Sequence, residues 1–406
     1  MLPMPSRWRT RCSMFKLLLA SYTNSLGHAG RCLNFLNKMD VDRWQCTVVG
    51  GGEYDCLFGC SVLDSWQVPY PLLGNWLKAY LPGLPFFTQE QRRQPSCPSR
   101  MIANAQYRLE NLTDHWLEIL DRHTPDIVIA DARPELYWAA RIRNIPVIGM
   151  MSLIWTPMFV AKFGLKPDNQ QIADDGLLDS FNRVGTTFCQ ESITDCWQPI
   201  QGVGSLIPDA SFFVGDNIDS NYLTIGPQLW RGPDLPVTDL LTRLDTAMPL
   251  VYITSGTSNF GIFKDVAELL ADKEIQVVLS GGIRGMKECQ VDSRGRLHVC
   301  SGMVPGFNFA RRANLMLCHG GSQTLYQAAS AGTFALVLPQ HFDHQRNGLL
   351  FAAHGMAQVL PPTSSALDVA CEVAARLKDN VQPVFFHSPE ESYSKDSLSS
   401  FLRRFF

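Results

Sequence analysis

A short apolar run, a glycine pair and a helical pattern place the strongest constraint on how this chain folds. The run is Leu315–Cys318, the turn is His319-Gly320-Gly321, and the Ala-rich helical stretch ends at Gly332. Such a run predicts a buried parallel strand, and the glycine pair predicts a tight turn into a helix. The unpaired N–H groups at a helix start bind anions. We therefore predict an anion site beside His319; the alternative is a glycine pair that only turns the chain.

Polar residues after the next apolar run indicate the same region. Pro339, Asp343 and Asn347 recur at four-residue intervals after 334–338. Ligands of parallel sheets bind at the carboxyl ends of strands beside a topological switch point, where both segments would lie. A phosphate site beside a carboxylate that can hydrogen-bond hydroxyls indicates a sugar nucleotide.

Length and composition limit the class of protein. The 406 residues suffice for two α/β domains, and a formal net charge of −3 gives no footprint for nucleic acid. Apolar runs are too short to span a bilayer, so we expect a cytoplasmic protein without an integral membrane segment. The 12 cysteines include no Cys-x-x-Cys pair, which favours buried thiols in a reducing cytoplasm over a disulfide frame or a metal site.

Strand and helix patterns alternate on both sides of a Pro- and Gly-rich segment. Alternation of this kind implies parallel, doubly wound α/β sheets. Strands are expected at 15–21, 127–130, 146–149, 250–254, 275–279, 297–299, 315–318 and 334–338, and a helix over about 102–120. We expect a disordered leader at 1–13, a first domain at 14–225, a linker at 226–247, a second domain at 248–388 and a terminal helix at 389–406.

The segment HGGSQTLYQAASAGTFALVLPQHFDHQRN, from His319 to Asn347, resembles the donor-binding signature of the UDP-glycosyltransferase superfamily (glycosyltransferase family 1). The resemblance includes the bacterial macrolide-type branch, and a weaker similarity starts near Met14. It implies the GT-B architecture, in which two Rossmann-like domains face each other across a cleft and the last helix returns to the first domain. The first domain would bind the acceptor and the second the donor. It also implies an inverting, metal-independent sugar transfer that uses a UDP- or dTDP-sugar as co-substrate and no other cofactor.

The resemblance also implies two catalytic residues at strand ends in the first domain. His28, in the loop 22–30 after the first strand, would be the base, and Asp131 would orient it. A neutral imidazole suits proton removal from an alcohol, and the carboxylate would stabilise the imidazolium as it forms. The alternatives are a loop-capping histidine and a turn or helix-capping aspartate.

The implied donor site is made of loops at the strand ends of the second domain. Its residues are Ser255, Gly256, Thr257, Val304, His319, Gly320, Gly321, Ser322, Gln323, Thr324, Gln327, Asp343 and His344. Helix N–H groups and His319 would stabilise the charge that grows on the departing diphosphate. Gln327 stands where the family often has a ribose-binding glutamate, and His344 replaces the glutamine of an Asp-Gln pair. An uncharged amide makes weaker bonds to hydroxyls than a carboxylate, so a binding-only protein is an alternative.

Aromatic residues in loop-like segments are the candidates for the acceptor side. They are Trp66, Tyr70, Trp76, Phe86, Trp155 and Phe159. They suit an apolar pocket for a lipophilic alcohol or phenol, such as a natural product; the alternative is core and lid packing. The remaining functional alternatives are a cell-envelope lipid glycosyltransferase, a sugar-nucleotide epimerase and a catalytically silent partner protein of the same fold. The oligomeric state is left open by the sequence.

Overall fold

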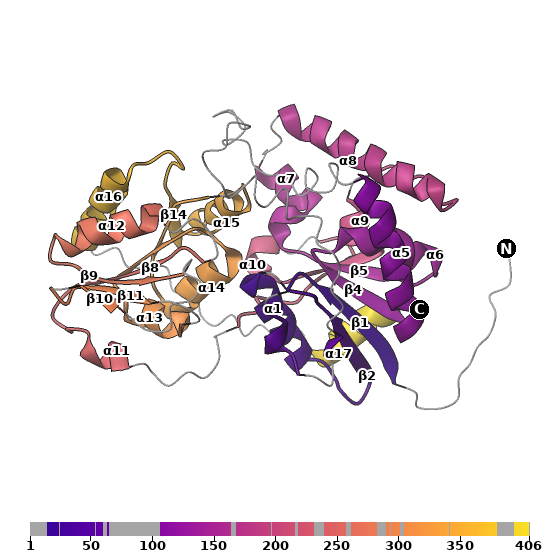
Figure 1. The fold of residues 1–406 in the computed structure, drawn as a ribbon, viewed down its shortest axis with the longest axis horizontal. Helices are drawn as coiled ribbons and strands as arrows, with labels where there is room; N and C mark the ends of the chain where they lie inside the picture. Colours follow the sequence, from indigo (N-terminus) through magenta and orange to yellow (C-terminus); the bar gives the residue numbers. More distant parts are fainter. Residues whose placement is uncertain are drawn as a thin grey trace.

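The computed structural model shows two lobes, each built on one seven-stranded sheet (Figure 1). It describes residues 14–23, 25–52, 54–59, 63–64, 106–163, 168–195, 197–215, 218–230, 239–256, 261–281, 290–292, 294–300, 304–340, 342–379 and 394–405. The predicted leader at 1–13 lies outside the described residues.

The sheet of the first lobe is parallel throughout, in the order β3-β2-β1-β4-β5-β6-β7. Its strands are β1 (Phe15–Ser21), β2 (Trp44–Val49), β3 (Leu63–Asp64), β4 (Ile127–Asp131), β5 (Val147–Met150), β6 (Gly204–Ile207) and β7 (Tyr222–Thr224). Its helices are α1 (Leu26–Asn37), η1 (Asp55–Leu57), α5 (Gln106–His123), η2 (Pro134–Leu136), α6 (Tyr137–Ile142), η3 (Leu153–Trp155), α7 (Pro157–Phe163), α8 (Asp168–Thr187), α9 (Gln198–Gln201) and α10 (Ser211–Val214).

The sheet of the second lobe has the order β10-β11-β9-β8-β12-β13-β14 and is parallel except for β10. Its strands are β8 (Leu250–Thr254), β9 (Gln276–Ser280), β10 (Gln290–Val291), β11 (Leu297–Cys300), β12 (Leu315–Cys318), β13 (Ala335–Val337) and β14 (Ala357–Val359). The helices after residue 230 are α11 (Asp239–Arg243), α12 (Gly261–Ala271), α13 (Gly306–Arg312), α14 (Ser322–Ala331), α15 (Phe342–Ala352), α16 (Ala366–Asp379) and α17 (Lys395–Arg403).

Alternation along the central strands explains why helices cover both faces of each sheet. In β1, Leu17 and Leu19 belong to the apolar cluster that also contains residues of α1 and α17, whereas Leu18 packs with α5 and α6. Successive side chains of a strand point to opposite faces, so a strand that is apolar throughout needs a layer on each side. The fold is therefore the predicted α/β arrangement of two doubly wound sheets.

Each sheet changes winding direction at one place, and these places position the site. The first sheet reverses between β1 and β4, where Ser21 pairs with Asp131. The second reverses between β8 and β12, where Thr254 pairs with Cys318. Crevices at the carboxyl ends of such strand pairs are the usual ligand sites of doubly wound sheets.

The last helix returns to the first lobe, as the family resemblance implies. Leu398, Phe401 and Leu402 of α17 are buried in the cluster that contains β1 and β2, beside α1 (Figure 1). Trp44 of β2 also donates a hydrogen bond to Ser399, 3.4 Å away. Burying an apolar side chain of this size contributes about 1.5–3 kcal/mol, so this helix fastens the end of the chain to its beginning.

Two local expectations differ from the structure, and one short helix was not expected. The loop after β1 ends at Ser25, so His28 lies in the first turn of α1 rather than in a loop. Helix α11 forms inside the predicted linker. Cys300 is disulfide-bonded, so the expectation of thiols fails for this cysteine. The spacing of cysteines along a sequence does not show which of them the fold brings within bonding distance. Six described cysteines are free: Cys32, Cys46, Cys56, Cys189, Cys318 and Cys371.

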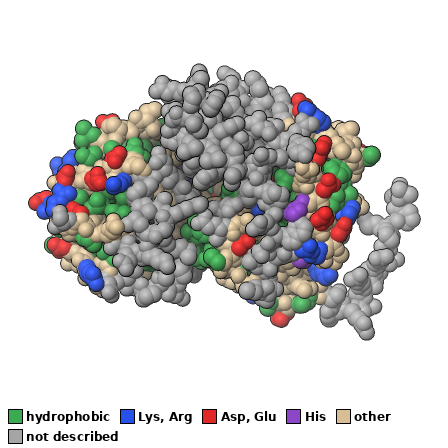
Figure 2. Space-filling model, viewed as in Figure 1, with side chains coloured by type: hydrophobic (Ala, Val, Ile, Leu, Met, Phe, Trp, Pro, Cys, Tyr) green, Lys and Arg blue, Asp and Glu red, His purple; other side chains and the backbone are tan. Residues whose placement is uncertain are grey.

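Charged side chains of both signs are interspersed at the two ends of the face shown in Figure 2. Within the described part of the chain, no helix is long and apolar enough to cross a bilayer.

Candidate functional site

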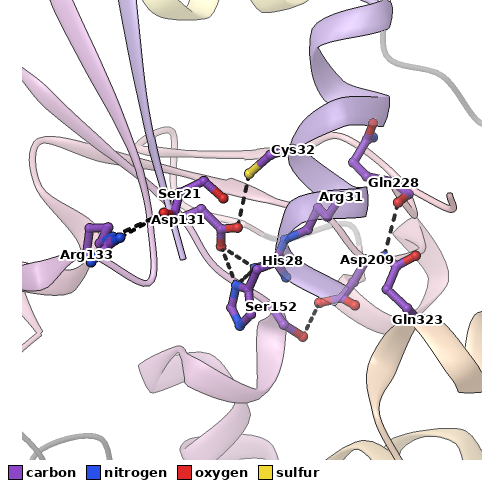
Figure 3. Close-up of polar contacts among 10 residues, drawn as sticks. All are labelled: Ser21, His28, Arg31, Cys32, Asp131, Arg133, Ser152, Asp209, Gln228 and Gln323. Atoms are coloured by element: carbon purple, nitrogen blue, oxygen red, sulfur yellow. Dashed lines mark hydrogen bonds and ion pairs between the residues drawn. The ribbon is translucent and has the colours of Figure 1, made fainter. Parts of the chain in front are cut away.

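His28 is placed at the reversal point of the first sheet by the start of α1. The chain leaves β1 at Ser21, and α1 begins after the extended residue Ser25. His28 Nδ1 lies 3.0 Å from Oδ1 of Asp131, and the histidine side chain is 31% exposed (Figure 3). The structure thus brings together the two predicted catalytic residues, with the ring partly open to solvent.

Asp131 is fully buried at the end of β4 and is bound by three side chains of α1. Besides His28, Arg31 donates to Oδ1, and the Cys32 thiol donates to Oδ2 across 3.1 Å. Burial alone would raise the pKa of Asp131, but Arg31 first and His28 second hold it well below its usual range. The residue is therefore a carboxylate at neutral pH.

Sequence analysis did not identify Arg31 and Cys32 as parts of this site. Both lie on α1, three and four residues after His28, and this spacing puts three side chains on one face of a helix. That periodicity was the available signal, but the helix start at Leu26 falls among glycines that predict a loop. A tertiary contact explains Gly30, because a Cβ there would lie 2.9 Å from Cβ of Trp230.

The His319-Gly320-Gly321 turn joins β12 to α14 as predicted and holds the histidine ring tightly. A Cβ at Gly256 would lie 2.5 Å from Cε1 of His319, and a Cβ at Gly321 would lie 2.5 Å from its Nε2. Gly320 and Gly256 both have positive φ, +98° and +56°. The 7% exposed ring is therefore packed between two glycine backbones at the reversal point of the second sheet.

The start of α14 and the loop after β8 supply polar groups at this place. Gly321 is the N-cap residue of α14 and makes no side-chain cap bond, so the first-turn N–H groups of Ser322, Gln323 and Thr324 are available to an anion. Ser255 is fully buried, and its hydroxyl has no hydrogen-bond partner among the described residues. A buried hydroxyl without a partner is costly unless a ligand satisfies it. Thr257 lies outside the described residues.

Helix α15, which follows β13, packs against the turn from the other side. Asn347 of α15 donates to the carbonyl of Gly320 across 3.1 Å. The ring of His344 lies edge-on to that of His319, with centroids 4.6 Å apart, whereas the side chain of Asp343 is 40% exposed. Of the predicted Asp343-His344 pair, the aspartate is thus open to solvent and the histidine is packed against the turn. Val304 lies before α13, and its carbonyl accepts from the N–H of Gly306 across 2.8 Å.

Gln323 and Gln327 contact the segment that leads from the first lobe to the second. Gln323 donates to the carbonyl of Gln228 across 3.0 Å, and Gln327 donates to that of Trp230 across 3.3 Å (Figure 3 shows Gln323 and Gln228). A Cβ at Gly27 would lie 3.7 Å from Cγ of Gln323. The first turn of α1, which carries His28, therefore meets the first turn of α14.

Two of the predicted acceptor residues, Trp155 and Phe159, lie beside a buried arginine of the second lobe. Arg346 of α15 lies over both rings, at 5.8 Å from Trp155 and 5.6 Å from Phe159, and donates to the carbonyl of Ile154. Phe159 is fully buried in the apolar core, whereas Trp155 is partly buried beside it. Trp66, Tyr70, Trp76 and Phe86 lie outside the described residues.

Comparison with known proteins gives relatives of one kind. No family model matches the chain. A PGL/p-HBAD biosynthesis glycosyltransferase of Mycobacterium tuberculosis (strain ATCC 25177 / H37Ra) is 25% identical over 57% of this chain and 58% of its own length. A PGL/p-HBAD biosynthesis rhamnosyltransferase of Mycobacterium bovis (strain BCG / Pasteur 1173P2) is 26% identical, over 57% and 55%. The chain thus spans less than three fifths of these curated relatives.

Solved structures match over nearly the whole chain. The spinosyn forosaminyltransferase SpnP has a TM-score of 0.62 at 18% identity, covering 97% of this chain and 99% of its own. The spinosyn rhamnosyltransferase SpnG, complexed with spinosyn aglycone, has a TM-score of 0.63 at 14% identity, covering 95% and 99%. These likenesses show the GT-B fold that the sequence led us to expect, and the curated relatives are glycosyltransferases by name.

Proposed function

We propose that this chain belongs to the UDP-glycosyltransferase superfamily and moves a sugar from a UDP or dTDP donor to a hydroxyl of an apolar acceptor, with inversion. One observation carries the proposal: the turn of α1 that bears His28, paired with a buried carboxylate, touches the first turn of α14. This proximity supports a base and an anion-binding helix start that act at one place. We assign the acceptor domain to 14–225 and the donor domain to 248–388 of a cytoplasmic enzyme.

The proposed chemistry divides between the two lobes. His28 takes the acceptor proton at Nε2 while Nδ1–H points at Asp131, and the freed oxygen forms a bond to the anomeric carbon as the bond to the diphosphate breaks. The first-turn N–H groups of α14 and the imidazole of His319 stabilise the charge that grows on the leaving group. The buried hydroxyl of Ser255 forms a hydrogen bond to the same nucleotide sugar.

The acceptor is proposed to be an apolar natural product with a hydroxyl. Support comes from Trp155, which packs at the edge of the apolar core that both lobes share. It also comes from the similar solved structure that holds spinosyn aglycone and from relatives named for PGL/p-HBAD biosynthesis. A lipid-linked acceptor, the alternative that the sequence leaves open, stays among the acceptors to be tested.

The substitution His28→Ala tests the assignment of the base. Nucleotide binding by calorimetry should stay within about twofold of the wild type, while transfer from a nucleotide-sugar panel should fall by about 10²–10⁴-fold. The exposed residue at the far end of the same helix gives the matched control, Asn37→Ala, which should keep full activity. EDTA should leave the wild-type rate unchanged. A His28→Ala variant that transfers sugar at the wild-type rate would contradict the assignment.

A catalytically silent protein of the same fold is the second candidate. The observation in its favour is that Gln323 and Gln327, two predicted donor contacts, donate to the backbone of the connecting segment. Titration with UDP, dTDP and GDP separates the two functions, since a silent protein that has lost the donor site binds none of them.

A further inference from the structure

Arg31 is the one cation that directly contacts both members of the His28–Asp131 pair among the described residues. Its Nη2 lies 2.8 Å from Nδ1 of His28 and also bonds Oδ1 of Asp131 (Figure 3). The same helical face supplies Cys32 as a third donor to the carboxylate. The edge of the Tyr22 ring covers the imidazole, with centroids 5.5 Å apart.

Burial fixes the charges of this cluster. Asp131 is 0% exposed and Arg31 is 7% exposed. Burial alone would lower the pKa of Arg31, but Asp131 raises it above its ordinary value, and the pKa of Asp131 is held well below its own. The charges of the Asp131 carboxylate and the Arg31 guanidinium therefore cancel. With a neutral His28, the cluster of these three residues and Cys32 carries no net charge.

Because Arg31 cancels the charge of Asp131, the carboxylate stabilises a protonated His28 less than a carboxylate without Arg31 would. A lone carboxylate beside an imidazole stabilises the imidazolium that forms when the ring takes a proton. Here the guanidinium lies as close to Nδ1 as the carboxylate does, so the new positive charge meets attraction and repulsion together. Arg31 also donates toward Nδ1, which competes with the Nδ1–H tautomer that leaves Nε2 free as the base.

We infer that Arg31 is a positioning residue that makes this site selective for an acidic acceptor hydroxyl, of the phenol class, over an aliphatic alcohol. The inference rests on the proposed glycosyl transfer. A phenolic O–H, with a pKa of about 10, releases its proton with little help, whereas an alcohol depends on a strongly stabilised base. In the step, the acceptor proton moves to Nε2 of His28, the phenolate oxygen bonds to the anomeric carbon, and the nucleoside diphosphate leaves with the electron pair.

The test compares two acceptors of the same shape class, 2-naphthol and 2-naphthalenemethanol, with UDP-glucose and dTDP-rhamnose as donors. The wild type should favour the phenol by about 100-fold in kcat/KM, the lower range of general-base effects. In Arg31→Met, the carboxylate acts alone on His28. The kcat/KM for the alcohol should therefore rise, and the ratio of phenol to alcohol kcat/KM should fall to about tenfold or less. The change should appear in kcat and leave the KM for the donor unchanged.

Two further variants separate charge from structure. Arg31→Lys keeps the cation and should keep the ratio. The double variant Arg31→Met/Asp131→Asn removes both charges, leaves the cluster neutral, and should also keep it. Nitrogen NMR of His28 should show a larger Nδ1–H population in Arg31→Met than in the wild type.

The wild type alone can overturn the inference even if Arg31→Met does not fold. A wild type that glycosylates the alcohol as fast as the phenol rules it out while leaving the proposed function intact, as does a folded Arg31→Met with an unchanged ratio. A wild type that binds nucleotide sugars but serves neither acceptor also overturns the inference. Absence of nucleotide binding, by contrast, ends the proposed function itself.

Discussion

At the scale of single residues, the carboxylate of Asp131 holds the first-lobe half of the site together. It accepts hydrogen bonds from Arg31 and Cys32 and pairs with His28, so one buried group fixes the orientation of one face of α1. Removing one partner of a buried ion pair leaves the other charge uncompensated, which costs more than the pair contributes. Asp131 thus serves stability as well as the proposed chemistry.

Asp131→Asn should lower the free energy of unfolding at pH 7 by about 3–5 kcal/mol, because Arg31 is left buried without a counter-charge. The folded-state pKa of Asp131 is depressed. Its stabilisation is therefore present above the unfolded pKa of about 3.9 and is lost as the pH falls below it. Urea unfolding from pH 7 to pH 2 should show the difference between wild type and variant shrinking from about pH 5 downward.

The Asp121–Arg143 pair provides the control for this prediction, since it is also an aspartate–arginine ion pair but lies at the surface. Asp121→Asn should change the free energy of unfolding by no more than about 1 kcal/mol. Equal losses in the two variants would show that burial of Asp131 is not what matters.

At the scale of elements, the parts of the fold that could be predicted from the sequence are those with a local cause. The apolar runs that became β1, β4, β8 and β12 are buried strands, and the glycine pair after β12 turns the chain into α14. Short strands such as β7, with three half-buried residues, lack that signal. The pairing of His28 with Asp131 followed from a family resemblance and from strand ends that adjoin in a parallel sheet.

Contacts between distant segments could not be predicted in this way. Gln323 and Gln327 were assigned to the donor, yet they hydrogen-bond the carbonyls of residues 228 and 230, about a hundred positions earlier. No local sequence pattern indicates these hydrogen bonds, because they depend on how the two lobes pack against the segment that connects them. The role of Arg31 could not be predicted for a related reason: it lies on helix α1, whereas its counter-ion Asp131 ends strand β4, 100 residues later.

The turn after β8 is the element whose geometry is most directly testable. Gly256→Ala places a Cβ 2.5 Å from the His319 ring and requires a φ of +56° from a residue with a side chain. We expect a loss of about 1–3 kcal/mol in unfolding free energy together with weaker nucleotide binding, because the His319 ring is displaced. Thermal unfolding and calorimetry with UDP measure the two effects.

Gly295 offers the matched control for this substitution, since its φ is +70° but no atom of the described residues lies within 4 Å of an added Cβ. Gly295→Ala should show the backbone strain alone, about 1 kcal/mol, with nucleotide binding unchanged. If both variants bind nucleotide as the wild type does, the packing of His319 between glycines does not shape the donor site.

At the scale of the whole molecule, the two lobes are joined by buried polar contacts as well as by the chain. The hydroxyl of Tyr326, on α14, donates to Asp209 and accepts from the N–H of Ala210, both at 2.9 Å, and these residues follow β6 of the first lobe. Asp209 also accepts from Ser152 and from the N–H of Leu153, beside the proposed acceptor wall. A donor-side helix is therefore tied to an acceptor-side segment through one carboxylate.

Tyr326→Phe removes this tie without changing the apolar packing of the ring. The substitution should lower the free energy of unfolding by about 1–3 kcal/mol, because it leaves the buried N–H of Ala210 without an acceptor and removes a hydrogen-bond donor to Asp209. Burial first and Asp209 second raise the pKa of Tyr326 well above 10. The stabilisation is thus complete below about pH 10 and is lost as the pH rises through the folded-state pKa, so the variant should lose less stability than the wild type above pH 10.

The distinctive expectation for Tyr326→Phe concerns cooperativity between the lobes. Tyr252→Phe is the control, because that hydroxyl hydrogen-bonds Ser280 at 2.8 Å inside the second lobe alone. In hydrogen exchange, Tyr326→Phe should raise the rate of exchange beside the tie in both lobes; in the first lobe these segments are 152–155 and 209–214. Tyr252→Phe should raise exchange in the second lobe only. If exchange in 152–155 is unchanged by Tyr326→Phe, the carboxylate does not couple the acceptor-side segment to the donor helix, and the lobes are held by apolar packing instead.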